Sequence, residues 1–168
     1  MTVNKRVAVV MGSDSDWAKV EPCIEVLKCF DIDYETRVIS AHRTPDVAIA
    51  FAKSAIDENF GVIICAAGMA AHLAGVMAAN STLPVIGIPL TGGAMDGLDA
   101  LLSTVQMPSG YPVATVAVNG AKNAAYLSAS ILSVYNPELR VKLREFRENN
   151  AESVLKKDEA IREKAAIK

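Results

Sequence analysis

The sequence predicts a doubly wound α/β fold, a three-layer sandwich with a central parallel sheet between two layers of helices. Several short runs are apolar throughout instead of alternating, which is typical of parallel strands that are buried on both faces. These runs alternate along the chain with segments whose apolar residues recur at helical spacing. Because right-handed crossovers join parallel strands, this order gives helices on both faces of one sheet.

The predicted elements follow one another without a linker, so we expect a single domain over residues 1–168. Its core is expected over about residues 6–135, and a helical tail over about 137–168. Strands are predicted at residues 7–11, 34–39, 62–66, 85–88 and 113–118. Helices are predicted around residues 20–27 and 47–55, over 70–80 and 121–134, and from about Pro137 onward.

Charge is distributed very unevenly along the chain. Between residues 60 and 121 the only charged side chains are Asp96 and Asp99, whereas the 32 residues from 137 to 168 carry 16 charges. One domain of this size does not readily bury about sixty nearly uncharged residues, so we expect the middle to face other copies of the chain. The apolar stripe of Leu139, Leu143 and Phe146 predicts that the last helix packs on the body, and its charged end is expected either to extend onto a neighbouring subunit or to fray.

Composition argues against several classes of partner. The formal charge of −2 gives no electrostatic reason to expect nucleic acid or an anionic membrane. The longest uncharged apolar stretch, residues 62–71, is about half the ~20 residues that a membrane span needs. No segment has the pattern of a secretory signal, so the cytoplasm is the expected compartment. The three cysteines, Cys23, Cys29 and Cys65, are interpreted as small apolar core residues.

In a sheet of this kind ligands bind beyond the carboxyl ends of the strands, so the segments that follow each strand are the candidates for a site. The first strand is followed by Gly12-Ser13-Asp14-Ser15-Asp16-Trp17. This segment fits either a plain N-cap turn or a phosphate subsite with Asp16 available for sugar hydroxyls. It matches neither the nucleoside triphosphate nor the dinucleotide glycine motif.

The second strand is followed by Ser40-Ala41-His42-Arg43-Thr44-Pro45. Arg43 beside hydroxyls at a helix start is suited to hold a phosphate, because its planar guanidinium stays charged. His42 would then lie next to the phosphate, where an imidazole can take and give a proton near neutral pH. The alternative is that His42 only caps a helix or packs against it.

Later loops are less informative. Around Gly68 and His72 small residues allow close approach of either a ligand or a neighbouring helix, and His72 alone fits a packed or interface position. His42 and His72 have no cysteine or carboxylate cluster beside them, which argues against a zinc site. Asp96 and Asp99, in the glycine-rich segment after the fourth strand, either cap a helix or face the site, and residues 106–113 form a turn that borders the pocket. The Gly-x-Ser-x-Gly motif of hydrolases is absent.

Four segments taken together resemble one known family. They are Val10-Met11-Gly12-Ser13-Asp14-Ser15-Asp16-Trp17, Ser40-Ala41-His42-Arg43-Thr44-Pro45, Ala70-Ala71-His72-Leu73 and Val105-Gln106-Met107-Pro108. In this order and at these spacings they resemble the N5-carboxyaminoimidazole ribonucleotide mutase family of bacterial purine biosynthesis, which leads to IMP. The likeness covers about residues 6–150. It implies a flavodoxin-like sandwich that assembles as a homo-octamer.

The resemblance also implies a reaction and a set of site residues. The carboxyl group on the exocyclic nitrogen of the substrate is lost as CO2 and rebuilt on ring carbon C4, with no metal, biotin, ATP or other cofactor. His42 is implied as the proton carrier. The residues implied to contact the ribonucleotide are Ser13, Ser15, Asp16, Ser40, Arg43, Gly68 and His72.

The chain departs from the family pattern in the third loop. Where the family commonly has Gly-Ala-Gly-Gly-Ala-Ala-His-Leu-Pro-Gly, this chain carries Ala66, Met69 and Ala74 in place of the first glycine, the last of the next two glycines and the proline. Two alternatives remain beside the mutase. One is the related carboxylase, which joins CO2 directly to aminoimidazole ribonucleotide, although Ala70-Ala71-His72-Leu73 favours the mutase. The other is a non-catalytic nucleotide-binding module.

Overall fold

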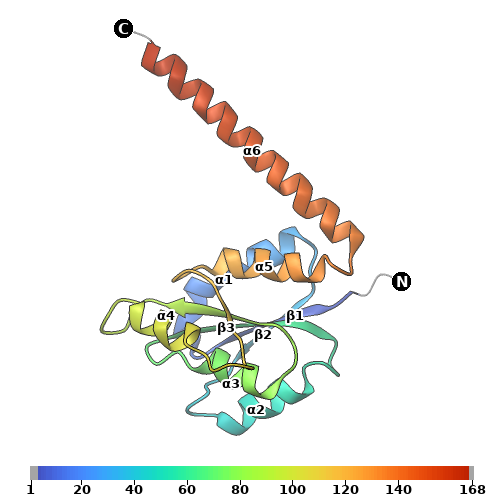
Figure 1. The fold of residues 1–168 in the computed structure, drawn as a ribbon, viewed down its shortest axis with the longest axis vertical. Coiled ribbons are helices and arrows are strands. Elements are labelled where there is room, and N and C mark those ends of the chain that lie inside the picture. Colours follow the sequence, from blue (N-terminus) through green and yellow to red (C-terminus); the bar gives the residue numbers. More distant parts are fainter. Residues whose placement is uncertain (1–3, 167–168) are drawn as a thin grey trace.

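A parallel sheet forms the middle layer of the computed structural model, which describes residues 4–166 (Figure 1). Its strands pair in the order β2-β1-β3-β4-β5, and every neighbouring pair is parallel. The strands are β1 (Arg6–Met11), β2 (Tyr34–Val38), β3 (Phe60–Gly68), β4 (Val85–Leu90) and β5 (Ala114–Thr115). The predicted α/β sandwich with a parallel sheet is therefore confirmed.

Helices cover both faces of the sheet (Figure 1). They are α1 (Trp17–Cys29), α2 (Pro45–Ser54), α3 (Leu73–Asn80), α4 (Leu98–Val105), α5 (Ala121–Leu132) and α6 (Pro137–Ala166), and the short 3-10 turn η1 (Asp14–Asp16) precedes α1. In β1, Val7 and Val9 pack with α1 and α5, whereas Ala8 and Val10 pack with α2 and α3. Successive side chains of a strand point to opposite faces, so a strand that is covered on both faces, as β1 is, must be apolar throughout.

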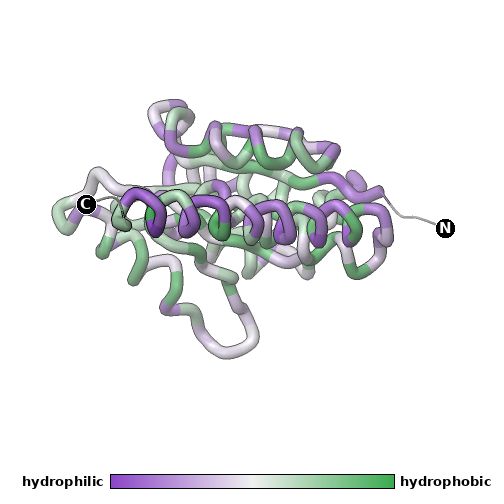
Figure 2. Tube along the Cα trace, turned by 90° about the horizontal axis from the view of Figure 1, so that it is seen from above, coloured by the Kyte–Doolittle hydropathy of each residue, from purple (hydrophilic) through white to green (hydrophobic). Residues whose placement is uncertain are grey.

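The helix α6 is held to the body only at its beginning. Leu139 and Leu143 are buried, and Phe146 stacks on Tyr126 of α5 with ring centroids 4.7 Å apart. Phe30, at the end of α1, contacts both rings edge to face. The predicted apolar stripe is thus confirmed, and the rest of the helix projects from the body as a largely hydrophilic rod (Figures 1 and 2).

Several predicted boundaries differ from the structure. The helix α4 was not predicted, because its eight residues lie between two segments rich in glycine and proline, although Leu98, Leu102 and Val105 do recur at helical spacing. The helix α3 begins at Leu73 instead of residue 70, because a turn precedes it. The strand β5 has two residues where six were predicted, since it is an edge strand with a single neighbour.

Two of the three cysteines are buried. Cys23 and Cys65 are buried as expected, and their burial raises the pKa of both thiols, that of Cys23 to about 12. The expectation of a core position for Cys29 was wrong, since it lies on the exposed side of the last turn of α1.

Across residues 4–166 the structure has no helix with the length and apolar character required to cross a bilayer.

The buried strand β4 predicts a strong effect of a single methyl group. A Cβ built on Gly87 would overlap the Thr104 methyl group of α4 and lie 3.1 Å from Cγ1 of Val113. Gly87→Ala should therefore lower the free energy of unfolding by roughly 1 to 3 kcal/mol through overpacking. Thr104→Ser removes that methyl group and keeps the hydroxyl, which donates to the Ala100 carbonyl at 2.7 Å. In chemical denaturation, the double variant should lose less free energy of unfolding than the sum of the losses in the two single variants. Losses that simply add up would contradict this packing.

Candidate active site

The topology places one crevice at the carboxyl ends of the strands. The strand order reverses at β1, which lies between β2 and β3, so the loops after β1 and β3 lead to helices on opposite faces. A ligand crevice is expected beyond this reversal. A cavity of about 690 Å³ lies there, and its lining comes from the segments that follow β1, β2, β3 and β4.

All eight residues that the sequence indicated line this one cavity. They are Ser13, Ser15, Asp16, Ser40, His42, Arg43, Gly68 and His72. The structure therefore brings together segments that are up to about sixty residues apart in the chain, as parallel strands with a common edge require. The individual roles of these residues in binding and catalysis stay predictions.

The loop after β1 is ordered by its own hydroxyl groups. Ser13 is the N-cap residue of η1, and its Oγ accepts hydrogen bonds from the backbone N–H of Ser15 at 3.3 Å and from the Ser15 hydroxyl at 2.8 Å. The interpretation as an N-cap turn is therefore confirmed. It does not exclude the phosphate subsite, because both serines also face the cavity.

The loop after β2 is a tight turn that is tied to the loop after β1. The Ser40 hydroxyl accepts hydrogen bonds from the backbone N–H of Arg43 at 3.1 Å and from its Nε at 3.3 Å. Nη2 of Arg43 donates to the Gly12 carbonyl at 2.9 Å and so joins the two loops. Pro45 occupies the first turn of α2, as its missing N–H favours. His42 is thus carried on a braced turn with its side chain exposed toward the cavity.

The loop after β3 has an unusual backbone. The Ala71 N–H donates to the Gly68 carbonyl at 3.0 Å, and both Met69 (φ 56°) and Ala71 (φ 34°) lie in the left-handed region. Residues other than glycine are strained in this backbone conformation, because their Cβ atom crowds the neighbouring backbone. His72 follows this turn, and Gly75 leaves room for its imidazole, since a Cβ on Gly75 would lie 2.9 Å from Cδ2 of His72.

Asp16 lines the cavity, and the pKa of its carboxyl group departs from the ordinary aspartate value. Burial raises the pKa of its carboxyl group, and this outweighs the opposing effects of a hydrogen bond from the Ser13 backbone and of the Lys19 and Arg43 charges. Asp16 is only partly buried, so its carboxylate oxygens can also accept hydrogen bonds from ligand hydroxyls.

Lys19, Thr91 and Gly92 also line the cavity and were missed by the sequence analysis. Nζ of Lys19 donates to the Thr91 carbonyl at 2.7 Å. Asp16 is the N-cap residue of α1 and Lys19 follows three residues later, a spacing that places both on one side of the helix start, which was the available signal. Thr91 and Gly92 begin the glycine-rich segment after the fourth strand, in which the sequence had indicated Asp96 and Asp99 instead.

Other predicted positions lie away from this cavity. Asp99 is in the first turn of α4, where its Oδ1 accepts from the Ala100 N–H at 3.0 Å, so it belongs to the helix start. The expectation that residues 106–113 border the site was wrong, since Gly110, Tyr111 and Pro112 line a different groove beside Lys53. Among residues 4–166 no three histidine, cysteine or acidic side chains form a group that could hold a metal ion.

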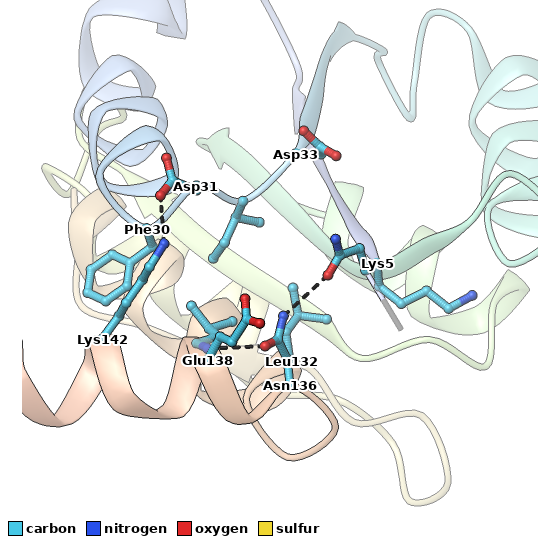
Figure 3. Close-up of a pocket in the computed structure, with 11 residues that line it drawn as sticks. Lys5, Phe30, Asp31, Asp33, Leu132, Asn136, Glu138 and Lys142 are labelled. Atoms are coloured by element: carbon cyan, nitrogen blue, oxygen red, sulfur yellow. Dashed lines mark hydrogen bonds and ion pairs between the residues drawn. The ribbon is translucent and has the colours of Figure 1, made fainter. Parts of the chain in front are cut away.

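A smaller cavity of about 200 Å³ lies at the opposite edge of the sheet (Figure 3). It is bordered by the segment before β1, the end of α1 and the beginning of α6. Nζ of Lys142 pairs with Asp31 at 2.6 Å, and Oδ1 of Asn136 accepts from the Leu139 N–H at 3.1 Å at the start of α6. These contacts describe the joint that carries α6, and they lie away from the carboxyl edge where ligands bind.

The raised pKa of Asp16 predicts a pH-dependent stabilisation by Asp16→Asn. A carboxyl pKa that is higher in the folded than in the unfolded protein destabilises the fold at pH values above both, and this penalty disappears as pH falls toward the ordinary aspartate value of 3.8. Asp16→Asn should therefore raise the Tm at pH 7, and the gain should shrink toward pH 3.8. A gain that stays constant across this range, or a lower Tm at pH 7, would contradict the assigned cause.

The left-handed conformation of Met69 predicts that glycine is preferred there. Relief of the strain should contribute roughly 1 to 2 kcal/mol, against roughly 0.5 to 1 kcal/mol of added chain entropy in the unfolded state. Met69→Gly should thus slightly increase the free energy of unfolding. Ala70→Gly is the matched control, because Ala70 has no positive φ and should only lose stability. Equal losses in both variants, measured by denaturant titration, would refute the strain at Met69.

Comparison with known proteins gives the family. The family model described as AIR carboxylase matches residues 6–153. N5-carboxyaminoimidazole ribonucleotide mutase of Saccharolobus solfataricus is 51% identical over 150 residues, which cover 89% of this chain and 95% of that protein. The protein of the same name from Thermotoga maritima is 50% identical over 152 residues, which cover 90% of this chain and 89% of its own.

A solved structure agrees with these sequence relatives. The crystal structure of Treponema denticola PurE superimposes with a TM-score of 0.84 at 32% sequence identity, over 93% of this chain and 98% of that one. The match of the family model spans the sheet and every segment that lines the cavity. This chain belongs to the AIR carboxylase family.

Proposed function

We propose that the cavity at the carboxyl edge of the sheet is the active site of an N5-carboxyaminoimidazole ribonucleotide mutase. Relatives with this name are about 50% identical over most of the chain. The observation that carries the assignment is the convergence of His42 and Arg43 with Ser13, Ser15 and Asp16 in one cavity. A proton carrier thereby adjoins a group of side chains suited to a ribonucleotide.

The proposed reaction is balanced without any co-reactant. The bond between the exocyclic nitrogen and its carboxyl carbon breaks and releases CO2, and protonated His42 supplies the proton that the nitrogen takes up. Ring carbon C4 then forms a bond to the same CO2 molecule, and neutral His42 removes the hydrogen from C4. One imidazole thus serves both halves as acid and base, and the cavity must retain CO2 between them.

The side chains that line the cavity match the separate parts of a ribonucleotide. Arg43 and the hydroxyls of Ser13, Ser15 and Ser40 suit the phosphate, because a guanidinium and hydroxyls donate to its oxygens. Asp16 suits the ribose hydroxyls, which donate to a carboxylate. Gly68, at the end of β3, and His72, at the start of α3, are assigned to the base and its carboxyl group.

The comparisons favour the mutase over direct carboxylation. The relatives that are named as mutases share about half of their residues with this chain. A non-catalytic module would bind the ribonucleotide and leave it unchanged, and it has no evident use for His42 beside the phosphate subsite.

We also propose that the chain works as a homo-oligomer, an octamer, in the cytoplasm. Leu98, Leu102 and Val105 form an exposed apolar stripe on α4, with side chains 45 to 46% exposed. This stripe lies within the charge-poor middle of the sequence. An apolar surface of this kind on a small protein is a typical interface between copies.

The function is tested with two substrates. The purified protein receives N5-carboxyaminoimidazole ribonucleotide in one assay, and aminoimidazole ribonucleotide with bicarbonate in the other, while formation of the C4 carboxylate is followed. Efficient use of the first substrate supports the mutase. Use of the second alone would assign the carboxylase, and binding without turnover would assign a binding module.

Variants of two adjacent residues should separate chemistry from binding. His42→Asn should lower kcat by at least about 10²-fold while the ribonucleotide still binds, because a positioned acid-base group contributes about 10² to 10⁴ in rate. Arg43→Ala should mainly raise KM, because the phosphate loses a charged partner. Steady-state kinetics and product affinity provide the measurement. Near-normal turnover of the His42 variant, or an unchanged KM for the Arg43 variant, would remove that residue from its role.

A further inference from the structure

The β4 side of the cavity is held by a chain of three polar residues from three parts of the fold. Lys19 belongs to α1, Thr91 directly follows β4, and Asn119 precedes α5. Nζ of Lys19 donates to the Thr91 carbonyl at 2.7 Å. Oδ1 of Asn119 accepts from the Thr91 N–H at 3.2 Å, and Nδ2 of Asn119 donates to the Thr91 hydroxyl at 3.1 Å.

These contacts engage every polar group of Thr91 beyond the end of the sheet. The strand β4 ends at Leu90, so the sheet ladder no longer fixes the chain there. Gly92 follows with φ 116°, a conformation that a glycine adopts without strain and that gives the segment little stiffness of its own. The backbone N–H of Asn119 donates to the Pro89 carbonyl at 2.9 Å and so anchors the Asn119 end to β4.

Lys19 differs from Asn119 because it carries a charge and lines the cavity itself. Its charged donor makes a stronger hydrogen bond to a carbonyl than a neutral group does. It lies on the face of α1 that also carries Asp16, and its charge acts on the Asp16 carboxylate. The position of a Cβ on Gly92 would be 3.7 Å from Nζ of Lys19, so the ammonium lies against the backbone of this wall.

We propose that Lys19 is a positioning residue that holds the Thr91–Gly92 segment against α1 and thereby keeps released CO2 inside the cavity. The inference rests on the proposed function. In that reaction a CO2 molecule that escapes before recapture leaves decarboxylated ribonucleotide as a by-product. The escaping fraction therefore reports how well the wall is closed, independently of the total rate.

The test measures this fraction in three lysine variants. Wild type, Lys19→Met, Lys19→Arg and Lys28→Met receive N5-carboxyaminoimidazole ribonucleotide, and the ratio of aminoimidazole ribonucleotide released to C4 carboxylate formed is determined at early times. Lys28 is the matched control, since it is an exposed lysine in the last turn of the same helix. Lys19→Met should raise the ratio by about tenfold, because small misplacements in a site carry effects of this size. Lys19→Arg should restore most of it, and Lys28→Met should equal wild type.

A second variant tests the same wall from the other end. Asn119 has φ 55°, so Asn119→Gly removes the amide without backbone strain. It should raise the ratio in the same direction as Lys19→Met. Equal ratios in Lys19→Met and Lys28→Met would overturn the proposal. A higher KM for Lys19→Met at an unchanged ratio would also overturn it, since that result would mean direct contact with substrate. If wild type forms no C4 carboxylate from this substrate, the proposed function itself fails, and the role of Lys19 fails with it.

Discussion

Parallel pairing of β1 with both β2 and β3 is the constraint on which the rest of the structure depends. Parallel strands end at the same edge, so every connecting segment that leaves β1, β2, β3 and β4 starts beside the others. The strand β1 is fully covered, with Val7 to Val10 at 0% exposure. Because β1, β3 and β4 are apolar where they are buried, the polar side chains of the cavity lie in the segments after the strands. The bond from Arg43 to the Gly12 carbonyl then fixes two of those segments to each other.

Close packing explains why so many small residues surround this edge. Gly87 leaves space for the Thr104 methyl group of α4, and Gly75 leaves space for the His72 ring. A larger residue at Gly87 would displace α4 from the sheet, and a larger residue at Gly75 would displace the His72 ring, which lines the cavity. Met69 is the exception, since its side chain is accommodated at a backbone position that favours glycine. Strain of this kind persists only where the surrounding structure fixes the loop, and it gathers at functional sites.

The sequence alone was sufficient to predict those features that depend on the residues of a single segment. Apolar runs identified the buried strands, and polar residues directly after two of them identified Ser13, Asp16, His42 and Arg43. The roles of these residues still depend on a ligand. The edge strand β5, the short helix α4 and the exposed side of Cys29 depend on neighbours that no local pattern contains. Lys19 and Thr91 were missed for the same reason, because a side chain of α1 meets a backbone carbonyl 72 positions away.

Asp16 is the acidic side chain in the lining of the cavity, and its charge is balanced by several groups around it. Two cations, Lys19 and Arg43, act to lower the pKa of this carboxyl group, and burial still raises it. The Asp16 carboxyl group is thus partly removed from water, and the hydrogen bond from the Ser13 backbone and the two nearby cations do not fully offset this. Lys19 and Arg43 themselves donate to backbone carbonyl groups, of Thr91 and of Gly12 respectively. The same bonds that brace the walls thus hold both cations near the Asp16 carboxyl group. Ribose hydroxyls are the donors that the proposed ribonucleotide would bring to it.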